Sequence, residues 1–543
     1  MRRFAILIAL ALWAFLLWRG LDAFGPGSDV NNLGFNSDSA IPVLMANDER
    51  RITVFNCYYY GADRWGAWPF LVGQLAGRAT GHRWTPESLS AFLIVWVFAG
   101  AWALAGLSRD EPWVAGVVYL LVVCLHQESR YLLFELSQVY AWQTTALLLS
   151  WVSLRRCFET FLGAQGHSGI RRSVWLLIVL SLSFLATWSS VASTVFLLFV
   201  AAVEIVRARA KARVPWTSRQ LLMPGVLGVV AIAAANLLER QLKTSYRRYS
   251  LQHYRDSFAT AFGVDTGHLA DNLAQHWQHL GRLSWWPLYV LPLVALLVLT
   301  FWAVYVRVTK RHALGERLST VFADDTVILA VGTYGIAALN LTLAVIVDHV
   351  RLNGYDDRYL TLTNLFAPVS GLLTLFILAR HAVRSSRFRT PVRAALVFGA
   401  AGLLTAAFPV ARDSPNYQQI ETAAKELVRR SPRGVLMGTY WDTYVFIAFQ
   451  PHDAMTPVPF EGHAFRTPWT IRALRRANEI IVAHAYAAGP VETALPSTLE
   501  QYGRRFTLAE PSWYENELYV FARYVVERAE QPVGSEPRGG RVQ

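Results

Sequence analysis

One carboxylate in the first polar segment of the chain has a clear chemical use. Asp38 lies in Gly34-Phe35-Asn36-Ser37-Asp38-Ser39-Ala40, shortly after the first apolar run. A fixed carboxylate can take a proton from a hydroxyl group, so Asp38 is a candidate general base. Asp29 and Asp48 remain alternatives for this role, and an ordinary solvated loop rich in turn-forming residues would have the same composition.

Aromatic side chains accompany the acids. The segment after Asp38 contains Tyr59, Tyr60 and Trp65, and Trp441 lies beside Asp442 in the last quarter of the chain. Aromatic rings have flat apolar faces and a polar edge, which suits contact with sugars and lipids. We predict that these four aromatic residues bind substrate or acceptor; for Trp441 the alternative is a place in the core or rim of a small domain.

Two arginine-tyrosine groups are candidates for binding phosphate. Arg358 and Tyr359 lie in Tyr355-Asp356-Asp357-Arg358-Tyr359, and Arg247 and Arg248 lie between two tyrosines. A guanidinium group presents a planar set of donors that matches phosphate oxygens. The alternatives are an ion pair of Arg358 with a neighbouring aspartate, and a solvated amphipathic helix around Arg247.

An ionisable cluster between two apolar runs is a further candidate. It is His126-Gln127-Glu128-Ser129-Arg130, with Glu135 following. Such groups close to the hydrocarbon are costly and are often functional. Glu128 is a candidate acceptor-binding residue, and Glu128 or Glu135 would offer oxygen ligands to a divalent cation together with Asp38. An anchoring pair between Arg130 and Glu135 explains the cluster equally well, so no metal site is assigned.

The composition indicates a membrane protein. The chain has 543 residues, of which 54% are hydrophobic and only 16% are charged, against about 25% charged in soluble proteins. Arginine supplies most of the net charge of +13, a bias typical of GC-rich bacterial genomes. The chain from residue 411 onward carries as many acidic as basic side chains. The excess of cations therefore belongs to the membrane part and indicates anionic lipid or phosphate, not nucleic acid.

The apolar runs predict about eleven membrane crossings. They begin with Phe4 to Trp18 and continue at residues 89–107, 112–126, 139–154, 174–187, 190–206, 221–238, 286–306, 325–347, 362–380 and 392–410. With the N-terminus in the cytoplasm, the basic clusters near Arg155, Arg207, Arg311 and Arg387 all fall in loops on the cytoplasmic side.

This count divides the chain into regions. We expect a mainly α polytopic membrane domain over residues 1–410, with outer loops 25–88 and 239–285. A small extracytoplasmic α/β domain should follow over 411–528, because strand patterns at 434–438, 479–484 and 518–526 alternate with helical ones. Residues 529–543 have the composition of a disordered tail. The expected location is the inner membrane of a bacterium, with the C-terminal domain in the periplasm.

This arrangement resembles the GT-C superfamily of integral-membrane glycosyltransferases, which includes protein O-mannosyltransferases and the bacterial transferase that adds aminoarabinose to lipid A. The resemblance covers most of the chain in architecture, but the motif match is confined to Asn36–Ala40 and Asp357-Arg358-Tyr359-Leu360. It implies a catalytic acid in the first outer loop, an Arg-Tyr pair near the lipid phosphate and a sugar donor on a polyprenyl phosphate or diphosphate. Many members have an Asp-Glu pair where this chain has Asp38-Ser39.

The sequence therefore predicts a glycosyltransferase that moves a sugar from a polyprenyl carrier to an outer acceptor, which would be a lipid, a glycan or a protein. One rival is a polysaccharide polymerase or ligase, which would centre on Arg247 and Arg248. A transporter of lipid-linked glycans is another, but it predicts internal repeats and mid-membrane charges. A third is a receptor whose C-terminal domain binds a ligand.

Overall fold

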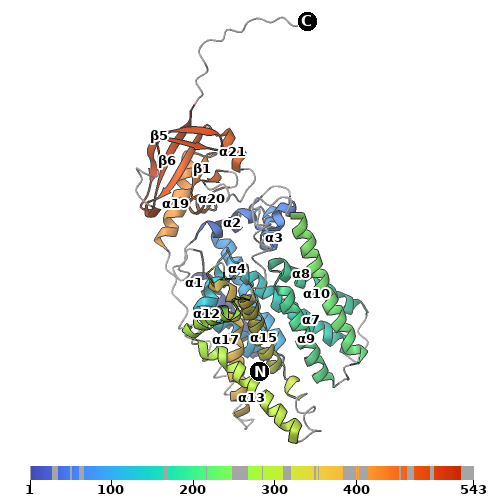
Figure 1. The fold of residues 1–543 in the computed structure, drawn as a ribbon. Helices are drawn as coiled ribbons and strands as arrows, with labels where there is room; N and C mark the ends of the chain where they lie inside the picture. Colours follow the sequence, from blue (N-terminus) through green and yellow to red (C-terminus); the bar gives the residue numbers. More distant parts are fainter. Residues whose placement is uncertain are drawn as a thin grey trace, which may run out of the picture. The chain divides into compact units, whose positions relative to one another are not determined.

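The computed structural model describes residues 2–26, 35–48, 52–59, 66–162, 169–213, 215, 217–246, 267–283, 285–309, 320–347, 350–351, 354–382, 399, 402, 414–451, 454–460, 470–488 and 495–527. The chain forms two units (Figure 1). The smaller unit consists of Phe35–Leu44 and the chain from Pro415 onward, and the larger unit consists of the remainder. Ten residues of the predicted first outer loop thus pack with the C-terminal unit.

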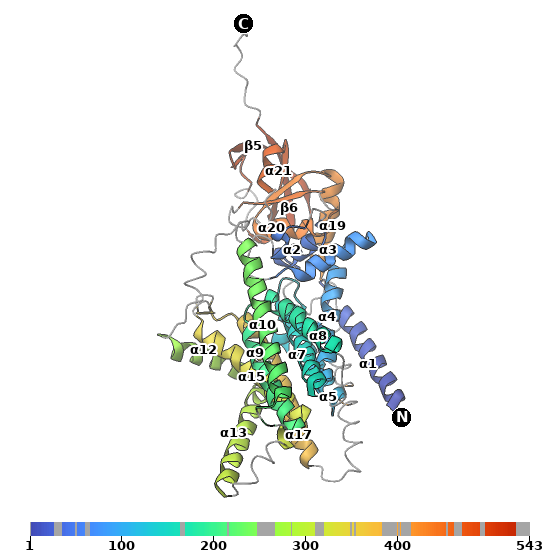
Figure 2. The ribbon, with the colours of Figure 1, turned by 90° about the vertical axis from the view of Figure 1, so that its right-hand side faces the viewer.

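The long helices of the larger unit coincide with the apolar runs of the sequence. They are α1 (Arg2–Ala23), α4 (Pro86–Leu107), α5 (Pro112–Leu125), α7 (Tyr140–Leu162), α8 (Gly169–Ser189), α9 (Ser193–Ala212), α10 (Arg219–Tyr246), α13 (Trp286–Thr309), α15 (Asp325–Ile346) and α17 (Thr361–Ala382). The last run, 392–410, lies outside the described residues except for 399 and 402. Helix α8 packs against both α7 and α10, and the three run side by side in Figure 2.

The surface of the larger unit is that of a membrane protein. Large apolar side chains stand exposed along its helices, among them Leu177 of α8, Val226 of α10 and Phe301 of α13. Such continuous apolar surface is stable only against lipid. Among the described residues, five helices are long and apolar enough to cross a membrane, or up to seven if each of two bent pairs is one span. The expected multi-pass architecture is confirmed, and the number of about eleven crossings stays a prediction.

Short helices occupy segments that the sequence analysis treated as loops. They are α2 (Ser37–Ala46), α3 (Trp68–Thr80), α6 (Gln127–Phe134) and α12 (Leu269–Arg282). Helix α3 has a proline in its first turn and ends at Gly81, whose φ of 68° is left-handed, as glycine permits at a helix end. Helices α5 and α6 meet at an 86° bend, and α12 and α13 meet at 116°.

Several cations expected in loops lie inside helices, which corrects the predicted boundaries. Arg155 and Arg156 belong to α7, and Arg207, Arg209 and Lys211 belong to α9. Arg155 and Arg207 are almost fully buried, and both bind the carboxylate of the buried Glu204 at 2.6 and 2.5 Å. A paired charge can be buried, whereas a lone charge cannot. The ion pairs therefore allow α7 and α9 to extend beyond the apolar runs with arginines inside the protein.

The buried charges extend to a third helix. Asp325, in the first turn of α15, contacts Arg207 at 3.4 Å and Lys211 at 2.6 Å. Trp151 of α7 also donates to Glu204 at 2.7 Å. We call Arg155, Glu204, Arg207, Lys211 and Asp325 the buried ion network; it joins α7, α9 and α15.

The smaller unit contains a mixed six-stranded sheet with the order β2-β1-β3-β6-β5-β4. The strands are β1 (Val435–Gly438), β2 (Thr456–Pro459), β3 (Glu479–Ala485), β4 (Thr498–Gln501), β5 (Arg504–Glu515) and β6 (Tyr519–Val526). Strand β1 is parallel to β2 and β3, whereas the β3–β6, β6–β5 and β5–β4 pairs are antiparallel. Helices α19 (Pro415–Arg430), α20 (Tyr440–Ile447) and α21 (Thr470–Arg476) complete the unit.

The core of this unit explains which strands the sequence revealed. Met437, Ile480 and Tyr524, from β1, β3 and β6, are fully buried in one apolar cluster. These are the three predicted strands, and they are confirmed. The sequence analysis missed β2, β4 and β5; β2 and β4 lie at the two edges of the sheet, and β5 lies between β4 and β6. Strand β2 has two prolines in Thr456-Pro457-Val458-Pro459, which an edge tolerates but which hides the strand pattern.

Candidate functional site

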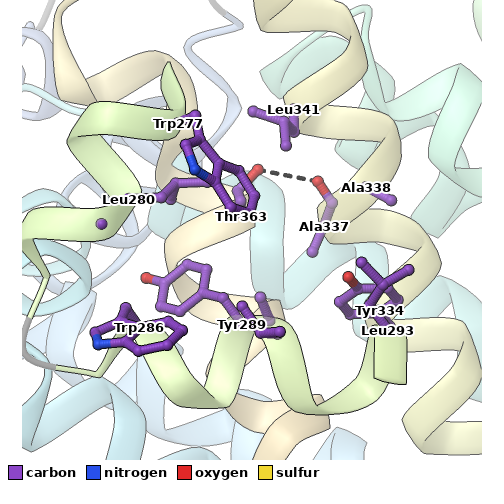
Figure 3. Close-up of a pocket in the computed structure, with 13 residues that line it drawn as sticks. Trp277, Leu280, Trp286, Tyr289, Leu293, Tyr334, Ala337, Ala338, Leu341 and Thr363 are labelled. Carbon is purple, nitrogen blue, oxygen red and sulfur yellow. Dashed lines mark hydrogen bonds between the residues drawn. The ribbon is translucent and has the colours of Figure 1, made fainter. Parts of the chain in front are cut away.

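An apolar cavity of about 330 Å³ lies between four helices of the larger unit (Figure 3). Helix α12 contributes Trp277 and Leu280, α13 contributes Trp286, Tyr289 and Leu293, α15 contributes Tyr334, Ala337, Ala338 and Leu341, and α17 contributes Thr363 and Ala367. The alanines leave space that larger side chains would fill. A lining of this kind suits an apolar chain with few polar groups.

A glycine sets one wall of this cavity. Helices α13 and α17 approach each other so closely at Gly371 that a Cβ atom there would lie 2.4 Å from the carbonyl oxygen of Leu288. Small residues permit this contact between membrane helices. The close approach fixes α13, and with it Tyr289 and Leu293, beside α17.

Arg358 and Tyr359 lie near the cavity, on the short helix η3 (Asp357–Leu360) before α17. The Arg358 guanidinium lies over the Tyr359 ring at 5.1 Å and contacts Asp356 at 3.4 Å. Asn340 donates to the Tyr359 carbonyl at 3.1 Å and accepts from the Thr363 hydroxyl at 2.9 Å. Because Thr363 lines the cavity, Asn340 joins the backbone of the Arg-Tyr pair to one residue of the cavity lining.

The loop before η3 is also fixed. Tyr355 donates to the Asn272 side chain of α12 at 2.6 Å, and Asn272 donates to the Val345 carbonyl of α15 at 2.9 Å. Tyr355 packs edge-on against His276 of α12. This chain of contacts holds α12, which supplies one wall of the cavity, against the end of α15.

A buried polar cluster lies on the α5–α6 side of the cavity. His126, which is 1% exposed, binds the Ser129 hydroxyl at 3.0 Å and the Tyr289 hydroxyl at 3.2 Å. Tyr289 also donates to the Asn364 side chain at 3.2 Å. Glu128, which the sequence predicted as a binding residue, lies 3.5 Å from His126 and is partly exposed.

The sequence analysis did not identify Tyr289 and Asn364. Tyr289 lies within an apolar run, and its partner His126, between α5 and α6, is 163 residues away, so its role depends on tertiary contacts. Asn364 offered a signal, because a polar amide inside an apolar run is unusual. For a metal, the described residues contain no group of three or more His, Cys, Asp or Glu side chains that could bind one.

Asp38 belongs to the smaller unit, where its surroundings are well defined. It lies in the first turn of α2, and the Tyr440 hydroxyl of α20 donates to its carboxylate. The Ser37 hydroxyl donates to the carbonyl groups of Tyr440 and Trp441 at 2.7 and 2.9 Å. Asn36 accepts from the Ser39 amide at 2.9 Å, as in a helix N-cap. The start of α2 is thus docked on the start of α20.

The start of α20 is in turn held on the sheet. Thr439 donates to the Asp442 carboxylate at 2.5 Å. Burial and the neighbouring Asp442 raise the pKa of the Tyr519 hydroxyl. Tyr519 of β6 therefore stays protonated and donates a hydrogen bond to the Asp442 carboxylate. Tyr440 therefore meets Asp38 from a fixed helix, and Trp441 next to it is 56% exposed.

The other predicted residues have different surroundings. Asp48 is buried at 3% exposure and accepts from the Asn56 side chain at 3.1 Å. Tyr59 is also buried, at 5% exposure. The remaining predicted positions lie outside the described residues; they are Asp29, Tyr60, Trp65, Arg247 and Arg248.

Comparison with known proteins gives a fold likeness. No protein-family model matches the sequence, and no curated protein matches it either. ArnT from Cupriavidus metallidurans, solved with bound undecaprenyl phosphate, is similar with a TM-score of 0.52, 10% identity and coverage of 96% of this chain and 98% of that chain. Oligosaccharyltransferase AglB from Archaeoglobus fulgidus has a TM-score of 0.42, 12% identity and coverage of 88% and 70%, which is too low to carry an inference. The chain therefore has the GT-C-like fold that its sequence predicted.

Proposed function

We propose that this chain is a membrane glycosyltransferase that takes a sugar from a polyprenyl-phosphate carrier and transfers it to an extracytoplasmic acceptor. The observation that carries the proposal is the apolar cavity together with Arg358 and Tyr359, which precede α17 and are joined through Asn340 to the cavity residue Thr363. Support comes from the GT-C-like fold shared with ArnT, which was solved with undecaprenyl phosphate. The sugar and the class of acceptor are left open.

The cavity and its rim suit the two ends of such a donor. The polyprenyl tail would lie along Tyr289, Leu293 and Ala338, where apolar burial stabilises it. The phosphate would bind the Arg358 guanidinium, whose planar donors match phosphate oxygens. A carrier with a membrane-bound tail can enter such a cavity laterally from the lipid.

The proposed reaction needs one base and one phosphate-binding cation. Asp38 would take the proton of the acceptor hydroxyl, and the acceptor oxygen would form a bond to the anomeric carbon. The bond between that carbon and the phosphate oxygen breaks, and its electron pair leaves with the polyprenyl phosphate, held by Arg358. A single carboxylate acting as base implies inversion at the anomeric carbon, by analogy with glycosidases. A divalent cation near Glu128 is not required by this scheme.

The test is transfer by purified protein in nanodiscs, using a panel of polyprenyl-linked sugars with and without chelator. Ala338→Phe should fill the cavity and weaken binding of undecaprenyl phosphate by at least about tenfold, since several apolar contacts are lost. Thr342→Phe is the matched control, because Thr342 lies on the same helix and is exposed without lining the cavity. Full donor binding by Ala338→Phe, or no transfer from any donor in the panel, would overturn the proposal.

A further inference from the structure

A second cavity, of about 370 Å³, opens beside the C-terminal end of α7. Its lining is mostly charged, whereas the first cavity is apolar. It is lined by Arg109 from the α4–α5 connection, by Arg156, Glu159 and Thr160 from the last turns of α7, and by Arg171 and Trp175 from the start of α8. None of these residues lines the apolar cavity. At roughly 30 Å³ per water molecule, the space would hold about ten waters or a small polar group.

The lining of this cavity carries an excess of positive charge. It contains three arginines against one glutamate. Glu159 is shared, because it contacts Arg109, binds Arg156 at 3.2 Å and lies 3.8 Å from the Arg207 guanidinium. The lining residues carry three positive charges and one negative charge, and such a net positive lining favours an anion with several acceptor oxygens.

The back of the cavity is rigid. Arg207, which meets Glu159 there, belongs to the buried ion network and is 2% exposed. Its partner Glu204 is fully buried and also binds Arg155. Glu159, which this network holds from behind, therefore offers Arg109 and Arg156 a fixed partner, and a fixed partner reduces the freedom that they lose when an anion binds.

Apolar surface beside the cavity indicates which anion fits. On α8, Ile170, Val174 and Leu177 are 76%, 48% and 62% exposed, and their spacing places them on one face of the helix. They flank Arg171 and Trp175, and tryptophan is enriched where lipid headgroups meet hydrocarbon. A ligand with a phosphate head and acyl chains would cover both the cavity and this face, whereas a free phosphate ion would cover only the cavity.

We propose that the cavity at Arg109, Arg156 and Arg171 binds the headgroup phosphate of an anionic glycerophospholipid. The acyl chains of the lipid lie along Ile170, Val174 and Leu177 of α8. Basic pockets between membrane helices bind such headgroups, most often in the cytoplasmic leaflet. This site does not depend on the proposed transferase activity.

The test compares two variants that each remove two positive charges. Arg156→Gln with Arg171→Gln changes the cavity, and Arg213→Gln with Arg219→Gln changes exposed arginines in the α9–α10 connection, outside the cavity. Each protein is placed in phosphatidylcholine nanodiscs that contain phosphatidylglycerol as the minor lipid. Native mass spectrometry then measures how much phosphatidylglycerol stays bound after transfer to detergent, and thermal unfolding measures the stabilisation that it gives.

Wild type and the Arg213/Arg219 variant should retain phosphatidylglycerol, and the Arg156/Arg171 variant should retain at least about a hundredfold less, since two charge-assisted contacts are lost. Arg171→Gln alone, at an exposed position, provides the same test if the paired change reduces folding. Equal retention by the two paired variants would overturn the proposal. So would an equal stabilisation by inorganic phosphate in pure phosphatidylcholine, which would indicate a site for a free anion.

Discussion

Asp38 and Asp48, which follow the first helix in the sequence, have different surroundings. The difference bears on which of them could act as the base. Asp48 is buried at 3% exposure with Asn56 as a hydrogen-bond partner. Asp38 is half-buried and binds the Tyr440 hydroxyl. A base must be reachable by its substrate, so we propose Asp38 rather than Asp48 as the base, a choice that the sequence left open.

Asp38→Asn should reduce transfer by about 10²- to 10⁴-fold, the usual contribution of a general base, while the protein remains folded. Asp48→Asn should act on stability instead, costing about 1–3 kcal/mol because a buried charged hydrogen bond is lost. Transfer assays and thermal unfolding of both variants separate these effects. Unchanged turnover in Asp38→Asn would remove this residue from the mechanism.

Arg358→Gln should weaken binding of the phosphate carrier by about 10- to 100-fold, because one charge-assisted contact is worth about 1.5–3 kcal/mol. Arg358→Lys should restore binding only in part, because lysine lacks the planar set of donors and stacks less well on Tyr359. Titration with undecaprenyl phosphate measures both. Arg240→Gln, at an exposed position near the end of α10, is the control; an equal loss there would show that the effect is general electrostatics.

At the scale of elements, the contact between α2 and α20 gives the C-terminal unit a part in the proposed chemistry. The Tyr440 hydroxyl orients the Asp38 carboxylate, and the Ser37 hydroxyl holds the two helix starts together. Tyr440 is therefore a positioning residue. Trp441 next to it is exposed, and we propose it as a contact for the acceptor.

Tyr440→Phe should lower kcat by about tenfold with little change in the acceptor KM, because a misoriented base affects the reaction step and not binding. Trp441→Ala should raise the acceptor KM with kcat retained, because it removes a stacking surface. Steady-state kinetics with varied acceptor distinguishes the two. The same KM increase in both variants would show that Tyr440 acts in acceptor binding.

The buried ion network makes a prediction about stability. Glu204→Gln removes the nearer of the two carboxylates that Arg155 and Arg207 share and leaves Asp325 as their remaining counter-charge, which should cost about 3 kcal/mol. Glu87→Gln, the same change at an exposed position on α4, should leave the melting temperature nearly unchanged. Thermal unfolding in detergent measures both variants, and equal melting temperatures would show that the network is not needed for stability.

The elements that the sequence predicted are those whose signal is local. Long apolar runs specified the helices, and three buried strands had strand composition. The edge strand β2 depends on its neighbours, and its prolines hide its strand pattern. Helix α12 has apolar residues at helical spacing, namely Leu273, Trp277 and Leu280, which the sequence analysis overlooked. In the same way, Arg358 and Tyr359 were found as a local motif, whereas Asp38 and its partner Tyr440 are 402 residues apart.

For the whole molecule, the charged groups of the helical unit support one orientation of its helices. The contacts of Glu159 with Arg109, Asp325 with Lys211 and Asp324 with Arg380 join the end of α7, the ends of α9 and α17 and the start of α15. The Arg-Tyr pair lies at the opposite ends of α15 and α17. Because cytoplasmic segments are rich in arginine and lysine, the end that holds the ion pairs should face the cytoplasm.

This orientation can be tested with single cysteines in a background where Cys57, Cys124 and Cys157 are replaced by serine. In intact bacterial spheroplasts, a membrane-impermeant maleimide should label Arg282→Cys, at the end of α12, and Trp441→Cys, in the C-terminal unit. Arg213→Cys, after α9, should react only after the membrane is permeabilised. Labelling of Arg282→Cys and Trp441→Cys from different sides would place Arg358 and Asp38 in separate compartments. One carboxylate could then not serve a sugar whose phosphate is bound by Arg358, and the transferase proposal would fail while the helical fold remained.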